Sequence, residues 1–586
     1  MDRGRLSASI LFASLAASPA FAQSGCPAPL ALVDTSRPDA VVGAGTPSSC
    51  TDAALASALS GGGVVVFDCG ASPVTIAVTS THAITKDTVI DGGGLVTLDG
   101  GGAVRILSVP SVFTFKSPTL TVQRLAFTRG NSAGVSGDDT VRGGGAIWCN
   151  GGNVHVIDCA FVDNHGPSDG QDVAGGAIYN VGLGEVTVVG SGFSGNSASN
   201  GGAIGVLHAG LTLVDSTVSN NAATGTGGNP GDGGNGGGIY SDGVDQIESF
   251  CGVTLEGNQA NAFGGGFFRV SNDGNGPMSI DRTSVLSNAI PDHAPNQPSM
   301  AGGLYLQGLQ IQLASSTIAW NRASFIGGLF LGPQSTTIAM TNVTVAENTA
   351  LSSLAGGMAI DSAVTGSIVN STIARNAAPG AGAFGGGTVG GSKVLLRNTI
   401  VDGNSVGNGY NPISCQTTFL EGGGNLQWPI ARAGGGSDSP GSLCSPSVLL
   451  ASAALGPLGE HGGPLLTIAP SAGSPAVGMG ESCPETDARG VARPADHCTA
   501  GAVELAPEAP AAWLQIASLA ALLGLGALRP LSNSGVKRTC MCTHERTSAE
   551  GRISGPPAAY SMSGSRRSSS SKATRISMRA RWAPRQ

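Results

Sequence analysis

The densest group of side chains that could hold a cation or transfer a proton lies between residues 163 and 172. It consists of His165 and three aspartates, Asp163, Asp169 and Asp172. Carboxylate oxygens are the usual ligands of calcium, and a carboxylate or an imidazole can act as a general base. The stretch also contains Gly, Pro and Ser, which is typical of a solvated loop. We favour the loop interpretation and expect no bound metal. The three aspartates are the candidate ligands of the alternative interpretation, a metal site.

A serine signature and several glycine clusters are further candidates for chemistry. Gly130–Gly134 reads G-x-S-x-G, a pattern that marks a nucleophilic serine only between a strand and a helix of an α/β sheet. Here it overlaps the turn of a sequence repeat. No glycine cluster is followed by Lys-Ser or Lys-Thr as in a phosphate-binding loop, and no HExxH zinc motif occurs. The sequence therefore predicts no catalytic residue and no cofactor.

Ten of the 12 cysteines precede the basic C-terminal region. Their spacing lacks the paired CxxC pattern of a zinc site, and an even number is typical of disulfides formed in an oxidising compartment. Proximity in the sequence predicts the pairs Cys50–Cys69, Cys415–Cys444 and Cys483–Cys498. A fourth close pair, Cys149–Cys159, leaves Cys26 and Cys251 without an assignment.

The composition restricts the fold. Glycine supplies 93 of the 586 residues, and charged residues make up 12%, about half of the usual ~25%. Hydrophobic residues reach 41%, more than a disordered chain contains, and the glycines lack the period of three of collagen. Such a composition favours short strands joined by tight turns.

A recurring phrase supplies those strands. It begins with Gly-Gly-Ala-Ile at 144–147, 175–178 and 201–204, continues as a short alternating strand, and closes as in Phe161-x-x-Asn164. The phrase recurs at intervals of about 30 residues, which is typical of stacked repeats. Asparagine tolerates the left-handed conformation at a corner, so we expect a ladder of side-chain amides along the stack. The first copy closes at Asn131, and the expected ladder comprises Asn164, Asn196, Asn221, Asn258, Asn288, Asn321, Asn348, Asn376 and Asn404.

An apolar column runs through the copies three residues before each of these asparagines, from Phe161 to Val401. A mostly small column lies two residues earlier still. One copy cannot bury its apolar face alone, whereas stacked copies form a continuous core. We therefore predict an all-β fold, a parallel β-helix or pectate-lyase-like solenoid, which is right-handed because its crossovers are parallel.

Enzymes that cleave polysaccharides also occur among parallel β-helices. A lyase of this fold needs acidic calcium ligands on neighbouring coils and an Arg or Lys base. Six residues before the ladder asparagines, Asp158 and Asp215 are separated by Gly190, so three carboxylates do not stack. We interpret this polar column as corner hydrogen bonding. A lyase or glycoside hydrolase remains the alternative, and the sequence favours a non-enzymatic role.

Both ends of the chain carry distinct signals. Residues 1–22 have the charged start, apolar stretch and Ala-Phe-Ala end of a signal peptide. Residues 51–59 predict a short capping helix on the first coil. The apolar run 511–528 could just span a bilayer as a helix, and it follows the proline-containing linker 506–510. We therefore expect a C-terminal hydrophobic anchor helix.

Charge divides the chain at this helix. Residues 529–586 contain 12 Lys and Arg but 2 Asp and Glu, whereas the whole chain has a net charge of -8. The body is therefore acidic, and an acidic body disfavours nucleic-acid binding. The basic tail is rich in Ser and Arg without periodicity, and we expect it to lack regular structure.

Three parts of the chain resemble known families. The Gly-Gly-Ala-Ile phrases with Phe161-x-x-Asn164 and Phe193-x-x-Asn196 resemble the repeat of bacterial polymorphic outer membrane proteins. Pro507-Glu508-Ala509-Pro510, the apolar helix and Arg529 resemble PEP-CTERM sorting tails. Residues 455–504 resemble the choice-of-anchor Q module, with Gly478 and Thr499 departing from its acidic positions and expected to loosen local turns. The matching residues of that module are Leu455-Gly456-Pro457-Leu458, Gly462-Gly463-Pro464, Gly473-Ser474-Pro475-Ala476, Asp487-x-Arg489-Gly490, Arg493-Pro494 and Gly501-Ala502-Val503-Glu504.

These resemblances imply an exported protein attached to the cell envelope, with no defined catalytic activity. We expect a structural or adhesive role carried by corner loops, with a glycan or a host or neighbouring-cell surface as candidate partner, no nucleic acid, and the membrane contacted through the C-terminal helix. The sequence does not predict the oligomeric state. The expected organisation is signal peptide 1–22, cap and first coils 23–118, β-helix repeats 119–415, choice-of-anchor Q-like module 416–505, linker 506–510, membrane or sorting helix 511–528 and basic tail 529–586.

Overall fold

The structure, a computed structural model, describes residues 25–505 apart from 230, 292–298, 334–335, 381, 408 and 430–442. The expected signal peptide, linker, apolar helix and basic tail therefore lie outside the described residues. Within the part that is described, no helix is long and apolar enough to cross a membrane.

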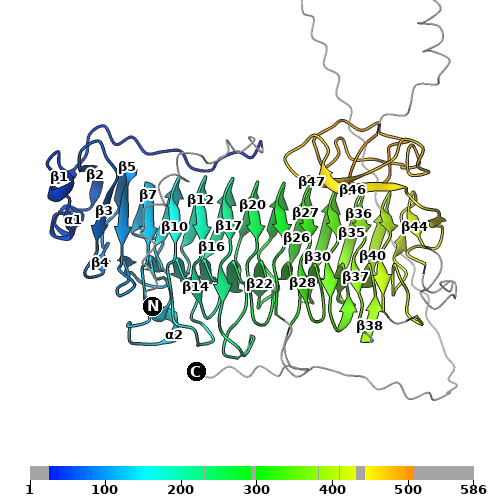
Figure 1. The fold of residues 1–586 in the computed structure, drawn as a ribbon, viewed down its shortest axis with the longest axis horizontal. Coiled ribbons are helices and arrows are strands. Elements are labelled where there is room, and N and C mark those ends of the chain that lie inside the picture. The colour runs from blue at the N-terminus through cyan, green and yellow to red at the C-terminus, as the bar shows by residue number, and fades with distance from the viewer. Residues whose placement is uncertain are drawn as a thin grey trace, which may run out of the picture. The chain divides into compact units, whose positions relative to one another are not determined.

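Short strands stack in three rows, to which successive turns of the chain add one strand each (Figure 1). Row 1 is an 11-stranded sheet in which the strands follow in chain order. Rows 2 and 3 join at their start through the long strands β5 (Thr88–Asp99) and β7 (Thr119–Thr128). The pairings between described strands within these rows are parallel. The chain is therefore a parallel β-solenoid, which confirms the predicted all-β class.

The strands have the following bounds. Row 1 comprises β4 (His82–Ala83), β6 (Leu107–Val109), β8 (Ile147–Asn150), β11 (Ile178–Val181), β15 (Ile204–Leu207), β19 (Ile239–Gly243), β22 (Phe267–Ser271), β25 (Leu304–Gln307), β29 (Leu329–Leu331), β34 (Met358–Ile360) and β39 (Thr388–Gly390). Row 2 comprises β9 (Asn153–Ile157), β12 (Glu185–Val189), β16 (Gly210–Val214), β20 (Glu248–Cys251), β23 (Met278–Asp281), β26 (Gln310–Ala314), β30 (Thr337–Thr341), β35 (Thr365–Val369), β40 (Val394–Arg397) and β43 (Leu420–Glu421). Row 3 comprises β10 (Ala160–Val162), β13 (Gly192–Ser194), β17 (Thr217–Ser219), β21 (Thr254–Glu256), β24 (Ser284–Leu286), β27 (Thr317–Ala319), β31 (Thr344–Ala346), β36 (Thr372–Ala374), β41 (Ile400–Asp402), β44 (Leu426–Trp428) and β45 (Leu449–Leu450).

The remaining elements are short. At the N-terminal end lie β1 (Ala40–Gly43), the 3-10 helix η1 (Pro47–Ser49), α1 (Asp52–Leu59), β2 (Gly63–Asp68) and β3 (Val74–Ala77), and α2 (Asp139–Arg142) lies in a later loop. Brief strands beyond the ladder asparagines are β14 (Ser197–Ala198), β18 (Ala222–Ala223), β28 (Arg322–Ala323), β32 (Thr349–Ala350), β33 (Ser353–Ala355), β37 (Ala377–Ala378), β38 (Gly382–Gly385) and β42 (Ser405–Val406). The hairpin β46 (Leu455–Glu460) and β47 (Leu466–Pro470) is antiparallel.

The strand register places each member of the apolar column beside the next. Phe161 pairs with Phe127 on one side and Phe193 on the other, and the column continues to Val401. The three phenylalanine rings are buried and stack with centroids 4.7 Å apart. Burying such a side chain stabilises a fold by roughly 1.5–3 kcal/mol. The expected apolar column is therefore the core of row 3.

The ladder asparagines bond to one another from coil to coil. Asn164 donates from its side-chain Nδ2 (3.0 Å) and from its backbone N (2.9 Å) to Oδ1 of Asn196. The same pair of contacts repeats along the row, ending with Asn376 on Asn404. Nδ2 of Asn196 also donates to the Phe161 carbonyl, 3.0 Å away. Each amide therefore satisfies backbone groups that the corner leaves buried without strand partners.

The ladder begins at Asn164 and does not include Asn131. Asn131 lies one residue beyond the ladder position, which Gly130 occupies. The Gly130 backbone N donates to Oδ1 of Asn164 over 2.9 Å. The side chain of Asn131 instead donates to the Gly102 carbonyl, and its backbone forms an isolated parallel β-bridge with His165. Phe127 is the counterpart of Phe161 in the apolar column. The ladder position lies three residues after the column position, which gives Asn164 after Phe161 and Gly130, not Asn131, after Phe127.

Two corners in each repeat hold one residue in the left-handed conformation. One corner precedes the small column, with φ of 52° at Asp158 and 57° at Asn342. The other directly precedes the ladder asparagine, with φ of 58° at both Asp163 and Trp320. The polar column that includes Asp158 is therefore a column of corners, as the sequence indicates.

Hydroxyl groups of the small column make a second ladder beside the first corner. The Ser191 hydroxyl accepts from the Cys159 backbone N (3.0 Å) and donates to the Val189 carbonyl (2.8 Å). The Ser191 backbone N donates in turn to the hydroxyl of Ser216. Small hydroxyl residues therefore recur at this position because they bond to the backbone of two coils.

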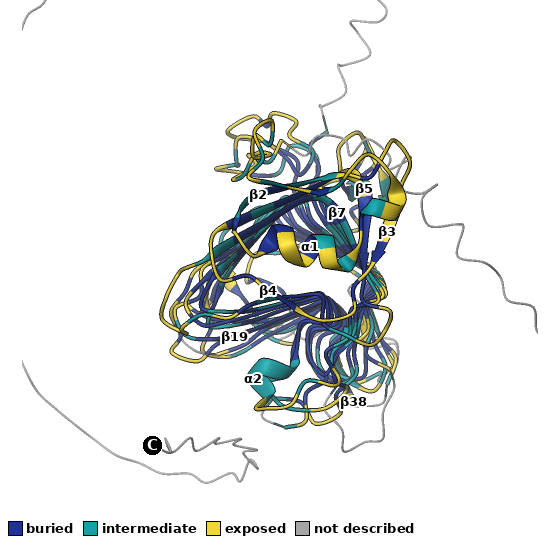
Figure 2. Cartoon of the chain, turned by 90° about the vertical axis from the view of Figure 1, so that its left-hand side faces the viewer, coloured by how far each residue is buried: buried dark blue, intermediate teal, exposed yellow. Residues whose placement is uncertain are grey.

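Helix α1 lies across the open end of the first coils (Figure 2). The Thr51 hydroxyl accepts from the Ala54 backbone N at the start of the helix. Asp52 accepts from the Thr79 backbone N (3.0 Å) and lies 2.7 Å from Nε2 of His82. Leu55 of the helix is fully buried. The sequence expectation of a helix at residues 51–59 agrees with this element.

The N-terminal strap, residues 25–39, runs along the outside of the stack from the β20 coil back to β1 (Figure 1). A disulfide joins Cys26 to Cys251 at its beginning. Further along, the Val33 backbone N donates to Gln123 and the Thr35 hydroxyl donates to Asp91. The strap therefore bridges coils that are distant in the sequence.

The cysteine predictions are correct for three disulfides and wrong for a fourth. The structure contains Cys50–Cys69, Cys415–Cys444 and Cys483–Cys498. Cys149 and Cys159 are free and buried. Cys149 lies on β8 of row 1, while Cys159 lies between rows 2 and 3, so sequence proximity does not bring their sulfurs together. Burial raises the pKa of both thiols to about 12, so they are packing residues.

Removing one rung of the ladder should destabilise the whole stack. Asn288→Ala removes the oxygen that accepts two bonds from Asn258 and leaves the Leu255 carbonyl without its donor. We expect a loss of about 3 kcal/mol in the free energy of unfolding, measured by denaturant titration. Asn131→Ala, off the ladder, should change it by less than about 0.5 kcal/mol. Equal losses in the two variants would contradict the ladder's role.

The contacts of Asp52 should make the first coils acid-sensitive. Partial burial raises the pKa of this carboxyl, but hydrogen bonds from Thr79 and His82 outweigh it and lower the pKa below its usual value. The stabilisation is therefore present at neutral pH and lost as pH falls through the lowered pKa. Asp52→Asn should be less stable than the parent at pH 7, and the gap should close below about pH 4. Exposed Asp232→Asn should show no gap at either pH.

Candidate functional site

The three candidate metal ligands face different surroundings. Asp163 lies 3.0 Å from Nε2 of His165. The side chain of Asp169 is 74% exposed, 3.8 Å from Arg142. Asp172 is half-buried, and burial together with the nearby carboxylates of Asp242 and Asp139 raises its pKa. Among the residues that the structure describes, no group of three or more His, Cys, Asp or Glu is arranged to hold a metal ion.

The loop that contains Asp172 covers an aromatic column on the outer face of row 1. The Tyr179 hydroxyl donates to the Asp172 carbonyl, and that of Tyr240 donates to the carboxylate of Asp242 over 3.0 Å. Both rings are fully buried. The register aligns Trp148, Tyr179, Gly205, Tyr240, Phe268, Tyr305 and Phe330. The sequence carried the signal, because an aromatic residue follows the Ile of several copies.

Ser132 of the G-x-S-x-G pattern is buried in the turn that follows β7. Its backbone N donates to the His165 carbonyl over 3.0 Å. No helix follows it directly, since α2 begins only at Asp139. The pattern is thus part of the stack, as expected from the repeat.

Two neighbouring hollows open at the corner between rows 1 and 2. The larger, the charged hollow, has a volume of about 530 Å³, and the smaller, the aromatic hollow, about 380 Å³. His208 lines both. The charged hollow is also lined by Lys116, Asn153, Leu183, Glu185, Asp245 and Ile247. The aromatic hollow is also lined by Phe113, Thr140, Trp148, Asn150, Val181 and Leu207.

A loop between β6 and β7 is built across this corner. The Phe113 carbonyl accepts from the Leu183 backbone N, 2.8 Å away and two coils further on. Glycine is required beneath the loop, because a Cβ on Gly151 would lie 1.9 Å from the Val112 carbonyl oxygen. The Phe113 ring reaches His208, with ring centroids 5.5 Å apart and an interplanar angle of 67°. The loop therefore carries an aromatic side chain along the stack to the shared wall of the two hollows.

The surroundings of His208 favour the neutral form of its imidazole. Burial lowers its pKa against the opposing effect of Asp242 and Asp273. Nδ1 lies 3.3 Å from the Val244 backbone N, which donates to it. The proton of the neutral ring is then on Nε2, which is the nitrogen left to donate to another group.

Sequence reasoning did not single out Phe113 or His208. Both line the aromatic hollow only because the loop crosses two later coils, and the repeat pattern contains no information about that path. The available signal was apolar residues, Leu183 and Ile247, at two corners that one further coil separates.

The C-terminal module, defined here as residues 451–505, packs on the outside of the last coils. Of the predicted module, residues 416–429 and 443–450 belong to the stack, because β43, β44 and β45 pair with rows 2 and 3. Three asparagines at the first corner bond to the module. Asn342 donates to the Thr486 carbonyl, Asn370 to that of Thr499 and Asn398 to that of Glu481. The first corner of these three coils therefore holds the C-terminal module against the stack.

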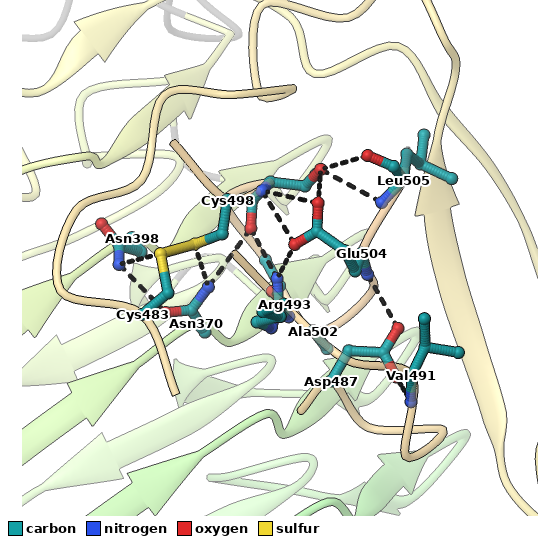
Figure 3. Close-up of polar contacts among 12 residues, drawn as sticks. Asn370, Asn398, Cys483, Asp487, Val491, Arg493, Cys498, Ala502, Glu504 and Leu505 are labelled. Carbon is teal, nitrogen blue, oxygen red and sulfur yellow. Dashed lines mark hydrogen bonds and ion pairs between the residues drawn. A yellow bond between two sulfur atoms is a disulfide. The ribbon is translucent and has the colours of Figure 1, made fainter. Parts of the chain in front are cut away.

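A buried ion pair closes the module (Figure 3). Arg493 lies 2.8 Å from Oε2 of Glu504 and donates to the carbonyls of Thr499 and Gly501. The Thr499 hydroxyl donates to Glu504 over 2.8 Å. Asp487 accepts from the backbone N of both Val491 and Glu504. Thr499 is therefore fully bonded, and the loosening expected at this position is absent. Gly478 adopts a φ of 73°.

Breaking this pair should release the module. Arg493→Met leaves the Glu504 carboxylate buried without its cation, which costs about 3–5 kcal/mol. Amide hydrogen exchange in residues 451–505 should therefore accelerate, while exchange in the early coils stays unchanged. The double variant Arg493→Met with Glu504→Leu removes both charges and should be less affected. A single variant no worse than the double one would contradict this role.

Comparisons with known proteins leave the family open. No family model matches the chain, and no curated protein matches it. The crystal structure of PfbA, a surface adhesin of Streptococcus pneumoniae, is similar over 74% of this chain and 100% of that chain, with 10% sequence identity and a TM-score of 0.26. A likeness at that identity and TM-score supports no statement about function. The polymorphic outer membrane protein and choice-of-anchor Q resemblances stay predictions.

Proposed function

We propose that this chain is an exported, envelope-attached β-solenoid that holds corner loops away from the cell for contact with other surfaces. The observation that carries the proposal is the set of four disulfides within one stack of coils. Disulfides form and persist in oxidising compartments and are rare in the cytosol. The signal peptide expected at residues 1–22 accounts for such a location.

The stack suits a scaffold role. The asparagine ladder and the apolar column are buried inside the stack. The loops leave from the corners, so their sequences can vary without changing these buried rows. Loops of different length leave the same corner, as at residues 166–173 and at 224–234, the latter described apart from residue 230. In a solenoid, insertions of this kind map to one face, which is often the binding face. The aromatic column on the outer face of row 1 lies beneath these loops, and Tyr179 of that column donates a hydrogen bond to the loop at Asp172.

The ends of the chain suit attachment. Helix α1 serves as the N-terminal cap, since open strand edges invite pairing with other chains. The C-terminal module covers the outer side of the last coils, and the apolar segment 511–528 supplies the anchor in this proposal.

Localisation tests the proposal directly. We expect the full chain, expressed in a bacterial host, to fractionate with the envelope and to show eight cysteines protected from alkylation until reduced. Deleting residues 1–22 should leave it in the cytosol with reduced thiols. Deleting residues 511–586 should release an oxidised, exported protein. A full chain found in the cytosol with reduced thiols would overturn the proposal.

A second assay separates contact from catalysis. Beads coated with the protein should bind cells or glycans without altering them. When pectin, alginate and other acidic glycans are supplied with calcium, no unsaturated or reducing ends should be released. Release of such products would replace the adhesive role with the polysaccharide lyase or glycoside hydrolase alternative.

A further inference from the structure

We propose that the charged and aromatic hollows on either side of His208 form one binding site for an oligosaccharide. The inference rests on the proposed contact function and names both the place of contact and the class of ligand.

The site is constructed rather than incidental. The loop that carries Phe113 is tied to two later coils, because Ser111 accepts from Nδ2 of Asn150 and Phe113 accepts from the Leu183 backbone N. Gly151 and Gly182 leave room for it, since a Cβ on Gly182 would lie 2.4 Å from the Phe113 carbonyl oxygen. A ligand would therefore meet walls that are already in position, and little ordering would oppose binding.

The walls combine apolar faces with charges of both signs. Phe113 is 39% exposed and Ile247 is 66% exposed, while Lys116, Glu185 and Asp245 line the charged hollow. A sugar ring presents C–H faces that pack on aromatic and aliphatic side chains and hydroxyl edges that bond to carboxylates, amides and ammonium groups. Each hollow has a volume in the range of small-ligand sites.

Other ligand classes fit these walls less well. A polyanion such as nucleic acid would face two carboxylates and one lysine, whereas phosphate recognition needs clustered Lys and Arg. A lipid chain would have to lie beside the charged groups without partners for them. An uncharged or singly charged oligosaccharide avoids both costs, and two adjacent hollows favour a ligand of several sugar units.

His208 stands where the hollows meet. Its Nδ1 is occupied by the Val244 backbone N, so the neutral ring offers the Nε2 proton as a donor. The Phe113 ring packs edge-to-face on the imidazole and keeps it in place. Substituting either residue should therefore disturb both hollows at once.

The test uses the purified full chain and a microarray of immobilised neutral and uronic-acid-containing oligosaccharides, followed by calorimetry with the best soluble hexasaccharide. We expect saturable binding that falls at least tenfold in both Phe113→Ala and His208→Ala. Phe115→Ala is the matched control, because Phe115 lies in the same loop, is 55% exposed and lines neither hollow. Its affinity should equal that of the parent. Circular dichroism and thermal unfolding establish that each variant keeps its fold.

Three results would overturn the inference. Binding that survives Phe113→Ala and His208→Ala would place the glycan elsewhere on the chain. Binding lost equally in Phe115→Ala would indicate nonspecific contact by exposed aromatic residues. No binding to any oligosaccharide, with coated beads still attaching to cells, would refute this site while leaving the proposed contact function intact.

Discussion

The structure depends on how buried backbone groups are satisfied where the chain turns a corner. Inside a strand the neighbouring coil supplies each hydrogen-bond partner, but at a corner the ladder breaks. Here one side-chain oxygen accepts from both the backbone N and the Nδ2 of the preceding asparagine. An unpaired buried amide costs about as much as a lost hydrogen bond. The asparagine row therefore completes the hydrogen bonding where the strand ladder breaks, and it holds successive coils in register at that corner.

A fixed backbone leaves the corner side chains free to diversify. At the first corner the left-handed conformation is held by the coils on either side, so Asp158, Arg282 and Asn398 can occupy equivalent positions. Late in the stack this freedom is used for docking, where successive asparagines bond to the C-terminal module. Earlier coils lack that run of asparagines. The module can therefore dock at only one set of coils, although the surface of the stack is otherwise repetitive.

The parts of the fold that repeat were predictable from sequence, and the parts that cross repeats were not. The pattern Phe161-x-x-Asn164 contains both the core column and the ladder, because side-chain alternation and corner chemistry are local. The partner of Cys26 depends on the path of an exposed strap, which has no periodicity. The approach of Phe113 to His208 likewise depends on a loop that leans over later coils. The glycines beneath that loop follow its course, but glycine is too common in this chain to be read as a signal.

The strap also affects how the molecule would carry load. A repeat protein ordinarily comes apart from its ends, since each coil is held only by its neighbours. With Cys26 bonded to Cys251, tension that enters at the N-terminus passes straight to the β20 coil and bypasses the coils in between. Those coils form a closed covalent loop that cannot be extended while the disulfide is intact. For a tethered protein that meets other surfaces, the early coils with their loops would keep their shape while the later coils bear the strain.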